Sequence, residues 1–351
     1  MRPVLRNALV VVVVVVAVVA GFVGGWYARP TSGGASNTTL GIIAAGSLSP
    51  STLLPALAST YANITPGVST PISAQLYEGS TAAATTIVSE GTNSPYDLFV
   101  SADFRVIPQH LMPPTESYAT GEAVFASDPI VLAYDPSAIS GVNSSNWYEK
   151  ITGPGIVLGV PNASADPLGQ NVIFTIELED AFADQGGSLY AHFFTGAPGG
   201  FASLTHSALY VTENNAATAL TVTHEVQAYL IYESYAKADG LSYVDLSPSV
   251  NLGGFAAGDV ANYQNASTTV LSGSSTKVVV GAPALFALTV PSNAPTAHVG
   301  NAFAAWLLSN ATAPTWVADG FTLTPTVWSY GAVAFLPGSN PALPSYLAAL
   351  I

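Results

Sequence analysis

Short apolar runs that end in small or acidic residues and lead into helix-like stretches recur along this chain. The first is GIIAAGSLSPS at Gly41–Ser51, where the run ends at Gly46-Ser47 and a helix-like stretch, Pro50–Ala62, follows. The first N–H groups of a helix have no intrahelical partner and lie at the positive end of the helix dipole, so such a turn can bind an anion. Ordinary helix capping also places Ser and Gly there. One such turn is therefore weak evidence for an anion site, and the repetition of the pattern along the chain is the stronger evidence.

Four more apolar runs end in the same way. They lead into Glu78-Gly79-Ser80, Ser101-Ala102-Asp103, Pro161–Gly169 and Glu233-Ser234. Strands that alternate with helices predict a parallel sheet covered by helices, and in such sheets ligands bind beyond the carboxyl ends of the strands. We expect the five strand ends to assemble one polar site from distant segments.

The order of elements predicts an α/β fold with two lobes. We expect lobe I to comprise residues 40–125 and 248–351, lobe II to comprise residues 126–247, and the chain to cross between them about twice. Expected strands lie at 40–45, 72–77, 97–100, 156–160, 229–232 and 284–290, and expected helices at 50–62, 80–90, 168–185, 214–226 and 296–308. The cleft between two such lobes is a natural site for a small ligand.

The first 27 residues carry a strong targeting signal. Arg2 and Arg6 precede Ala8–Tyr27, which is apolar throughout and long enough to span a bilayer. This predicts an N-terminal membrane helix that anchors the protein on the extracellular side of the plasma membrane; a cleaved signal and a secreted protein are the alternative. Residues 28–39 are rich in Gly, Ser and Thr and predict a flexible linker. Six glycosylation sequons fit an exported surface: Asn37, Asn63, Asn143, Asn162, Asn265 and Asn310.

Composition excludes several function classes. Charged residues make up 8% of the chain and the formal net charge is −14, with seven Lys and Arg residues, so there is no basic footprint for nucleic acid. One explanation for so few charged residues is that the protein works in an acidic medium, where carboxylates are protonated and many Lys and Arg residues would repel one another. The chain has no Cys, which excludes disulfides and thiolate chemistry. The five His residues are widely spaced, and the chain has no Walker A or GxSxG motif.

Eight segments occur in the order GSLS, YEGS, SADFRVIP, FASDPIVLAY, NWYEKI, ADPLG, IYESYAK and GFTLTP, over roughly residues 40–325. In this order and spacing the chain resembles the archaeal tungstate- and molybdate-binding proteins of ABC importers, the ModA/WtpA group. The resemblance implies the type II periplasmic-binding-protein fold, with two lobes that close on an oxyanion. It also implies a monomer without a cofactor, which delivers its ligand to an ABC permease driven by a separate ATPase.

The resemblance also implies site residues. Ser47 and Ser80 match the family's hydroxyl donors to the oxyanion, and Asp166 and Glu233 match two carboxylates that coordinate its Mo or W atom and expand it from tetrahedral to octahedral. The family's Gly-Tyr-Arg is replaced here by Gly169-Gln170-Asn171. Further candidates for ligand contact are Gly46, Gly79, Ser101, Ser127, Ser234 and Tyr235.

Carboxylates at an anion site need a reason, because they repel a dianion. Carboxylates are compatible with such a site if their hard oxygen atoms coordinate a high-valent metal such as Mo or W. The sulfur atom of sulfate cannot take these additional oxygen ligands. Sulfate or phosphate is nevertheless an alternative ligand. An extracellular glycosidase that uses Asp166 and Glu233 as its acid and base, and an adhesive surface protein, are further alternatives. A plain helix cap remains open for Asp166, which precedes Pro167, and a solvated strand end remains open for Glu233.

Overall fold

The computed structural model describes residues 38–48, 53–65, 68–69, 75–112, 117–183, 186–272, 274–336 and 340–351. The predicted membrane helix at 1–27 and nearly all of the predicted linker at 28–39 lie outside these ranges. Within them, no helix has both the length and the apolar character needed to cross a membrane.

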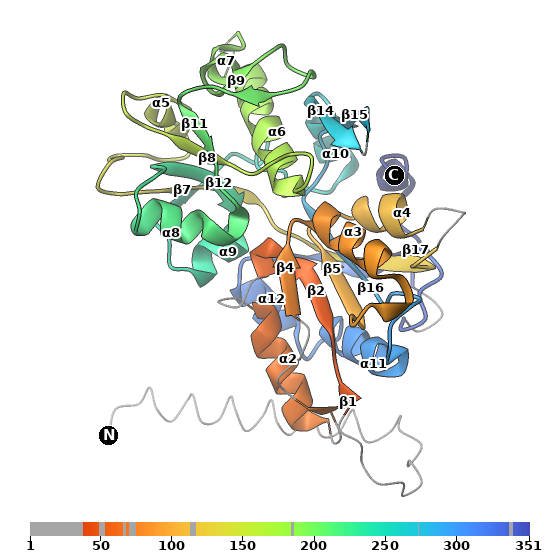
Figure 1. The fold of residues 1–351 in the computed structure, drawn as a ribbon. Coiled ribbons are helices and arrows are strands. Elements are labelled where there is room, and N and C mark those ends of the chain that lie inside the picture. The colour runs from red at the N-terminus through yellow and green to blue at the C-terminus, as the bar shows by residue number, and fades with distance from the viewer. Residues whose placement is uncertain are drawn as a thin grey trace, which may run out of the picture.

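A six-stranded mixed sheet forms the centre of one lobe (Figure 1). Its strands, in spatial order, are β17 (Thr322–Gly331), β6 (Gly121–Ser127), β16 (Leu285–Thr289), β5 (Leu98–Ser101), β2 (Ile42–Ala45) and β4 (Gln75–Glu78). Its helices are α2 (Leu53–Ile64), α3 (Ser80–Glu90), α4 (Val106–Leu111), α11 (Ala297–Leu307), α12 (Ala313–Ala318) and α13 (Ser345–Ala348). We call this body lobe I.

A five-stranded sheet forms the centre of the other lobe, which we call lobe II. Its strands, in spatial order, are β11 (Ala208–Tyr210), β8 (Leu158–Val160), β12 (Ala228–Tyr232), β7 (Ile130–Tyr134) and β13 (Tyr243–Asp245). Its helices are α5 (Trp147–Ile151), α6 (Pro167–Phe182), α7 (Ser188–Phe193), α8 (Ala216–Thr221) and α9 (Glu233–Ala238). Short pairs β1 (Thr38–Thr39) with β3 (Val68–Ser69), and β9 (Phe194–Thr195) with β10 (Ser203–Leu204), lie outside both sheets.

Parallel pairing places the expected strand ends at common edges. In lobe I, β2 pairs in parallel with β4 and with β5, so all three end at the same edge. In lobe II, β8 pairs in parallel with β12 and with β11. The remaining strands of lobe I run antiparallel, so its sheet is mixed rather than wholly parallel as the sequence suggested.

The chain crosses between the lobes at two segments that lie side by side. The first joins β6 to β7 through Asp128 and Pro129, and the second runs past Asn251 and Gly253 toward α10 (Ala257–Tyr263). The Ser127 hydroxyl donates to the Gly253 carbonyl at 2.8 Å, and the Ile130 N–H donates to the Asn251 carbonyl at 2.7 Å. These bonds hold the two connecting segments together.

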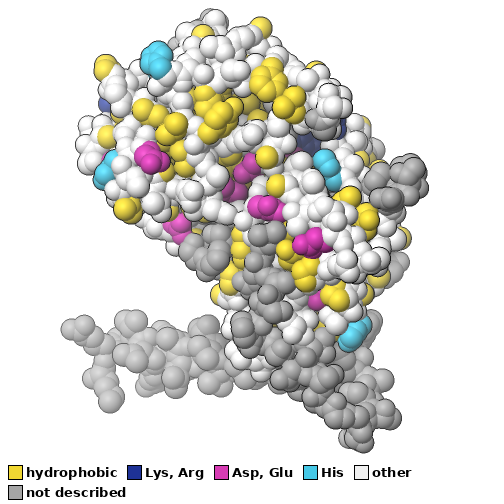
Figure 2. Space-filling view, viewed as in Figure 1, with side chains coloured by type: hydrophobic (Ala, Val, Ile, Leu, Met, Phe, Trp, Pro, Cys, Tyr) yellow, Lys and Arg dark blue, Asp and Glu magenta, His cyan; other side chains and the backbone are white. Residues whose placement is uncertain are grey.

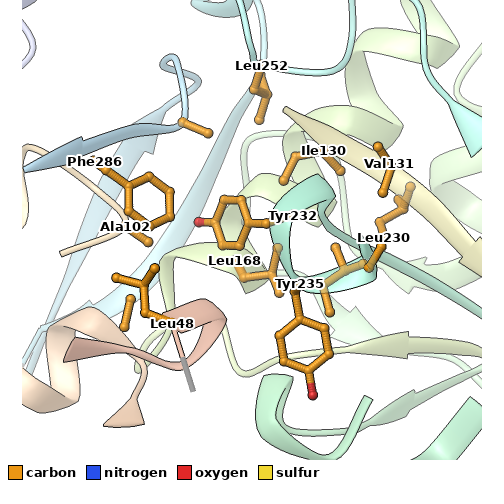
Figure 3. Packing of buried hydrophobic residues seen from close by; sticks show 14 of the residues in the cluster. Leu48, Ala102, Ile130, Val131, Leu168, Leu230, Tyr232, Tyr235, Leu252 and Phe286 are labelled. Atoms are coloured by element: carbon orange, nitrogen blue, oxygen red, sulfur yellow. The ribbon is translucent and has the colours of Figure 1, made fainter. Parts of the chain in front are cut away.

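One apolar core runs from lobe I into lobe II. Tyr232, at the end of β12, packs edge-on against Phe286 of β16 with ring centroids 5.6 Å apart. Figure 3 shows Tyr232 between Phe286 on one side and Ile130 on the other. Because these side chains are fully buried, the connection between the lobes is stabilised by burial as well as by hydrogen bonds.

A hairpin that the sequence did not predict joins the two lobes a second time. It consists of β14 (Ser267–Ser272) and β15 (Ser275–Val280), and Figure 1 shows it beside α6. Glu177 of α6 accepts the N–H of Ser267 at 2.8 Å, while Arg105 of lobe I donates to the Val280 carbonyl at 2.8 Å. The hairpin is therefore tied to both bodies.

Candidate functional site

A pocket of about 280 Å³ opens where the strand ends of the two lobes meet. Its lobe I wall comes from the turns after β2 and β4, and its lobe II wall from the segments after β8 and β11. It is lined by Gly46, Glu78, Gly79, Ala82, Pro161, Asn162, Ala165, Asp166, Tyr210, Val211, Thr212, Glu213 and Asn214. This volume can hold one small solute or several water molecules.

Two glycines allow the lobes to approach closely at this pocket. A Cβ atom at Gly46 would lie 2.7 Å from the carboxylate Oε2 of Glu213, and one at Gly79 would lie 2.5 Å from the carbonyl oxygen of Ala165. Both neighbours belong to lobe II. A side chain at either position would therefore press the lobes apart.

Ser47 and Ser80 follow these glycines and are fully buried. The Ser47 hydroxyl has no hydrogen-bond partner among the described residues. The Ser80 hydroxyl accepts the backbone N–H of Ala102 at 2.9 Å, which leaves its own proton available to donate. Neither hydroxyl caps a helix here, because Gly79 is the N-cap residue of α3 and Gly46-Ser47 lies in the short 3₁₀ turn η1 (Gly46–Leu48).

Asp166 lies at the pocket as the N-cap residue of α6, with Pro167 in the first helical position. Its Oδ1 accepts the Leu168 N–H at 2.9 Å. Burial raises the pKa of Asp166 to about 6, and the bond from Leu168 opposes that shift. The capping and ligand-contact interpretations are therefore compatible, because one oxygen caps the helix and the residue still lines the pocket.

Glu213 and Asn214 face lobe I from the 3₁₀ turn η3 (Glu213–Asn215), which follows β11. The Asn214 amide donates to the Tyr77 carbonyl at 2.9 Å, and the backbone N–H of Ser47 interacts with the Glu213 carboxylate and opposes the rise of its pKa. Glu213 is 3% exposed, and its Oε1 has no partner among the described residues. Burial, then the nearby Asp166 and Asp128 carboxylates, raise its pKa well above the usual range.

The pocket is acidic and lacks a basic side chain. None of its described lining residues is Lys, Arg or His, whereas Glu78, Asp166 and Glu213 contribute carboxylates. Figure 2 shows Asp and Glu side chains near the middle of one face of the molecule, with little Lys or Arg beside them. Any counter-charge for a bound anion must therefore come from backbone N–H groups, hydroxyls and helix N-termini.

Glu233 lies elsewhere, at the start of α9. Its Oε1 is 2.6 Å from Nζ of Lys237, one helical turn later, and its side chain is 18% exposed. It is not among the pocket-lining residues. Beside it, the Ser234 N–H donates to Oδ1 of Asp128 at 3.2 Å, and the Ser234 hydroxyl is buried without a partner among the described residues.

The other candidates have structural contacts away from the pocket. The Ser101 hydroxyl donates to the Asp103 carbonyl at 2.7 Å, and the Ser127 hydroxyl holds the crossing segments together. Tyr235 is buried, and Figure 3 shows its hydroxyl directed away from Tyr232. Asn171, in place of the family's Arg, donates to the Tyr232 hydroxyl at 3.1 Å.

Three of the five predicted strand ends therefore meet at the pocket: those at Gly46, Gly79 and Asp166. Glu213 was not predicted from the sequence, because the short strand β11 that precedes it was not recognised. The signal was present in ALYVTEN, an apolar run that ends in a polar and acidic pair ahead of a helix.

Comparison with known proteins places the chain in a family. The sequence profile described as "Bacterial extracellular solute-binding protein" matches residues 40–322, which include lobe II, most of lobe I and every pocket-lining residue. The chain belongs to the bacterial extracellular solute-binding protein family. This family consists of binding proteins, which confirms the expectation that the chain is not an enzyme and removes the glycosidase alternative.

Several members of this solute-binding family resemble the chain over part of its length. An uncharacterized solute-binding protein of Methanococcus maripaludis is 28% identical over 58% of this chain and 64% of its own length. The molybdate/tungstate-binding protein WtpA of Thermococcus kodakarensis is 24% identical over 60% of this chain and 62% of its own length. The matches thus span slightly less than two thirds of these relatives.

Among solved structures, the periplasmic molybdate-binding protein of Azotobacter vinelandii aligns with a TM-score of 0.49 and 14% identity. The alignment covers 81% of this chain and 99% of that one.

Proposed function

We propose that this solute-binding protein captures tungstate or molybdate and delivers it to an ABC importer. The observation that carries the proposal is the pocket itself, where two Gly-Ser turns of lobe I face carboxylate residues of lobe II and none of the described lining residues is basic. The similarity to WtpA supports the same ligand class.

The charge of the pocket favours a metal-centred oxyanion over sulfate or phosphate. A carboxylate within a few ångströms repels any dianion, and this repulsion is strong where water is excluded. Mo and W can bind additional oxygen ligands. An oxygen of the Asp166 carboxylate could therefore coordinate the metal atom, and this bond would offset the repulsion. Hard oxygen donors suit such a metal.

The lobe I donors would hold the oxo groups of the ligand. Ser47 and Ser80 can donate hydrogen bonds from their hydroxyls, and helices α3 and α6 both begin at the pocket. A helix N-terminus contributes about 0.3–1 kcal/mol when exposed and up to ~2 kcal/mol when partly buried. Nanomolar affinity requires about 12 kcal/mol, so coordination and direct hydrogen bonds must supply most of it.

For Glu233, the prediction that it coordinates the metal stays a prediction. Coordination would require its carboxylate to leave Lys237 at 2.6 Å and reach the pocket. Coordination of the metal by Glu233 can therefore be tested separately from coordination by Asp166.

Closure of the two lobes is the proposed capture step. The closing bodies would be residues 40–125 with 248–351, and residues 126–247. A ligand that contacts both walls favours the closed state by the contacts it makes only there. The closed monomer would then dock on a membrane permease driven by a separate ATPase. We further propose that residues 1–27 hold the protein at the outer surface of the membrane through the apolar segment Ala8–Tyr27, or are removed to release it.

A cationic solute is the second candidate, because the same uncompensated carboxylates would attract a positive charge. A thermal-shift panel distinguishes the candidates, since a ligand that binds the folded state raises its melting temperature. We expect tungstate and molybdate to raise it, and sulfate, phosphate and the diamine putrescine to leave it unchanged. A shift with putrescine alone would replace the oxyanion proposal with the cationic one.

A further inference from the structure

We propose that Glu213 is the second carboxylate of the binding site, and that it contacts the bound oxyanion opposite Ser47 and selects which anion is accepted. The inference rests on the proposed function and deepens it, because it assigns a ligand contact and a basis for specificity to a residue outside the family motifs.

Glu213 lies at the end of a strand of lobe II and faces lobe I. It begins η3 directly after β11, so its side chain leaves lobe II at the carboxyl end of a parallel strand. It reaches across to lobe I, where its Oε2 lies against Gly46 and its carboxylate interacts with the Ser47 N–H. Ser47 is the residue that the family resemblance assigns to the oxyanion.

Two buried polar atoms without partners point to a ligand at this place. Oε1 of Glu213 and Oγ of Ser47 both lack a hydrogen-bond partner among the described residues. The two residues are 3% and 0% exposed. Glu213 lines the pocket, and Ser47 directly follows the lining residue Gly46. Buried polar groups in folded proteins are normally paired, so two unpaired ones at this boundary between the lobes indicate that a solute pairs with them.

Among the residues that the structure describes, no basic group compensates the charge of Glu213. The titratable groups whose charges interact with it are Asp166 at the N-terminus of α6, Asp128 in the first crossing segment, and Tyr229, Tyr232 and Tyr235 around β12. All of these are acids. Glu213 differs in this from Glu233, which has a cationic partner in Lys237, and from Glu177, whose two oxygens both accept backbone N–H groups.

The two walls of the pocket also match residue by residue. The turn at Gly46 faces Glu213, and the turn at Gly79 faces the backbone and Cβ of Asp166. Each lobe I turn thus meets one lobe II carboxylate residue. Two carboxylates on one wall and two Gly-Ser turns on the other would surround a tetrahedral oxyanion.

This arrangement determines specificity. Sulfate and phosphate cannot accept a carboxylate oxygen at their central atom, so Glu213 in its ionised form only repels them. Tungstate and molybdate can accept it, so Glu213 contributes to their affinity. Removal of the charge should therefore weaken tungstate and relieve the exclusion of sulfate.

The test compares the full-length protein with its Glu213→Gln, Glu213→Asp, Asp166→Asn and Glu233→Gln variants by calorimetric titration with sodium tungstate and sodium sulfate. We expect Glu213→Gln to weaken tungstate by about tenfold or more, equivalent to about 1.4 kcal/mol, and to leave sulfate unchanged or bound more tightly. Glu213→Asp keeps the charge but shortens the side chain, and should weaken tungstate without admitting sulfate. Glu233→Gln tests the other candidate carboxylate and should weaken tungstate less than Glu213→Gln does. A fifth variant, Glu149→Gln at an exposed residue of α5, is the matched control and should leave both affinities unchanged.

The outcomes separate this inference from the proposed function. If Asp166→Asn weakens tungstate binding and Glu213→Gln does not, the proposed role of Glu213 is wrong and the proposed function stands. Tighter tungstate binding by Glu213→Gln would overturn it too, because Glu213 would then compete with the ligand for the Ser47 N–H. Failure of the unmodified protein to bind any oxyanion would remove the function itself, and the inference with it. Circular dichroism and thermal unfolding verify that each variant is folded.

Discussion

The backbone N–H of Ser47 interacts with the side-chain carboxylate of Glu213 and opposes the rise of its pKa, and the two residues belong to different lobes. Their segments are 166 positions apart in the sequence, yet they meet where β2 and β11 end. Close beside them, Asn214 donates to the Tyr77 carbonyl across the same boundary at 2.9 Å. The lobes are therefore in direct contact at the residues that form the pocket.

Closure should depend more on Gly79 than on Gly46. A Cβ at Gly79 would meet backbone atoms of Ala165 and Asp166 at 2.5–2.9 Å, whereas one at Gly46 would meet the ends of the Glu213 and Asn214 side chains, which can move. We expect Gly79→Ala to reduce tungstate affinity by about tenfold or more, and Gly46→Ala to have a smaller effect. Small-angle scattering with tungstate checks whether Gly79→Ala stays more open. Equal affinities for the two variants would contradict the prediction.

Asp166 should show separable roles in stability and binding. Asn caps a helix about as well as Asp, so Asp166→Asn keeps the bond to the Leu168 N–H and removes the charge, whereas Asp166→Ala removes both. We expect Asp166→Ala to lose about 1 kcal/mol of unfolding free energy and Asp166→Asn to lose much less. Both should bind tungstate weakly. If Asp166→Asn binds normally, Asp166 is a cap and not a ligand contact.

Asp128 should make the protein more stable in acid than at neutral pH. Burial raises its pKa from 3.8 to about 8, although the hydrogen bond from the Ser234 N–H opposes the shift. Between these values the folded protein retains a proton that the unfolded chain releases. The free energy of unfolding therefore falls as pH rises from about 4 to 8, by up to about 1.4 kcal/mol per pH unit.

Asp128→Asn mimics the protonated side chain and should flatten this slope. Chemical denaturation at pH 4, 6 and 8 measures it. The exposed Asp245 of β13 provides the control, and Asp245→Asn should leave the slope unchanged. Burial likewise raises the pKa of Asp319 to about 6, so part of the slope should persist in Asp128→Asn. A protein that is least stable at pH 4 would contradict this account.

Glu177 should control the attachment of the β14–β15 hairpin to lobe II. Its two oxygens accept the N–H groups of Gly199 at 3.1 Å and Ser267 at 2.8 Å. We expect Glu177→Ala to cost about 1–3 kcal/mol of unfolding free energy, since hydrogen bonds to a charged group are lost. Hydrogen exchange should accelerate within residues 267–280 and stay unchanged in β2 and β5. Uniform acceleration across the chain would indicate global destabilisation instead.

The sequence predicted the parts of the fold that have strong local signals. The helix at 80–90 matches α3, and the helix at 168–185 and the strand at 229–232 match α6 and β12 within a few residues. Apolar periodicity and turn residues determine these elements locally. The β14–β15 hairpin and β11 were missed, because short, partly exposed strands carry little hydrophobic pattern and depend on tertiary contacts.

The site was predictable in its lobe I half. Gly46-Ser47 and Gly79-Ser80 follow buried strands, and both turns reach the pocket. Strand ends alone could not identify which carboxylates face them, because this depends on how the two lobes meet. Glu233 ends a strand as clearly as Glu213 does, but Lys237 one turn later offers it a partner, and this pairing is evident only once α9 is placed.

The most direct test of the central claim is calorimetric titration of the full-length protein in mild detergent with tungstate, molybdate, sulfate and phosphate. The account predicts tight binding of tungstate and molybdate, with sulfate and phosphate weaker by about a hundredfold or more, equivalent to about 2.7 kcal/mol. Equal or tighter binding of sulfate or phosphate would contradict the assignment of acidic residues as ligand contacts. Absence of binding by all four anions would contradict the proposed function as a whole.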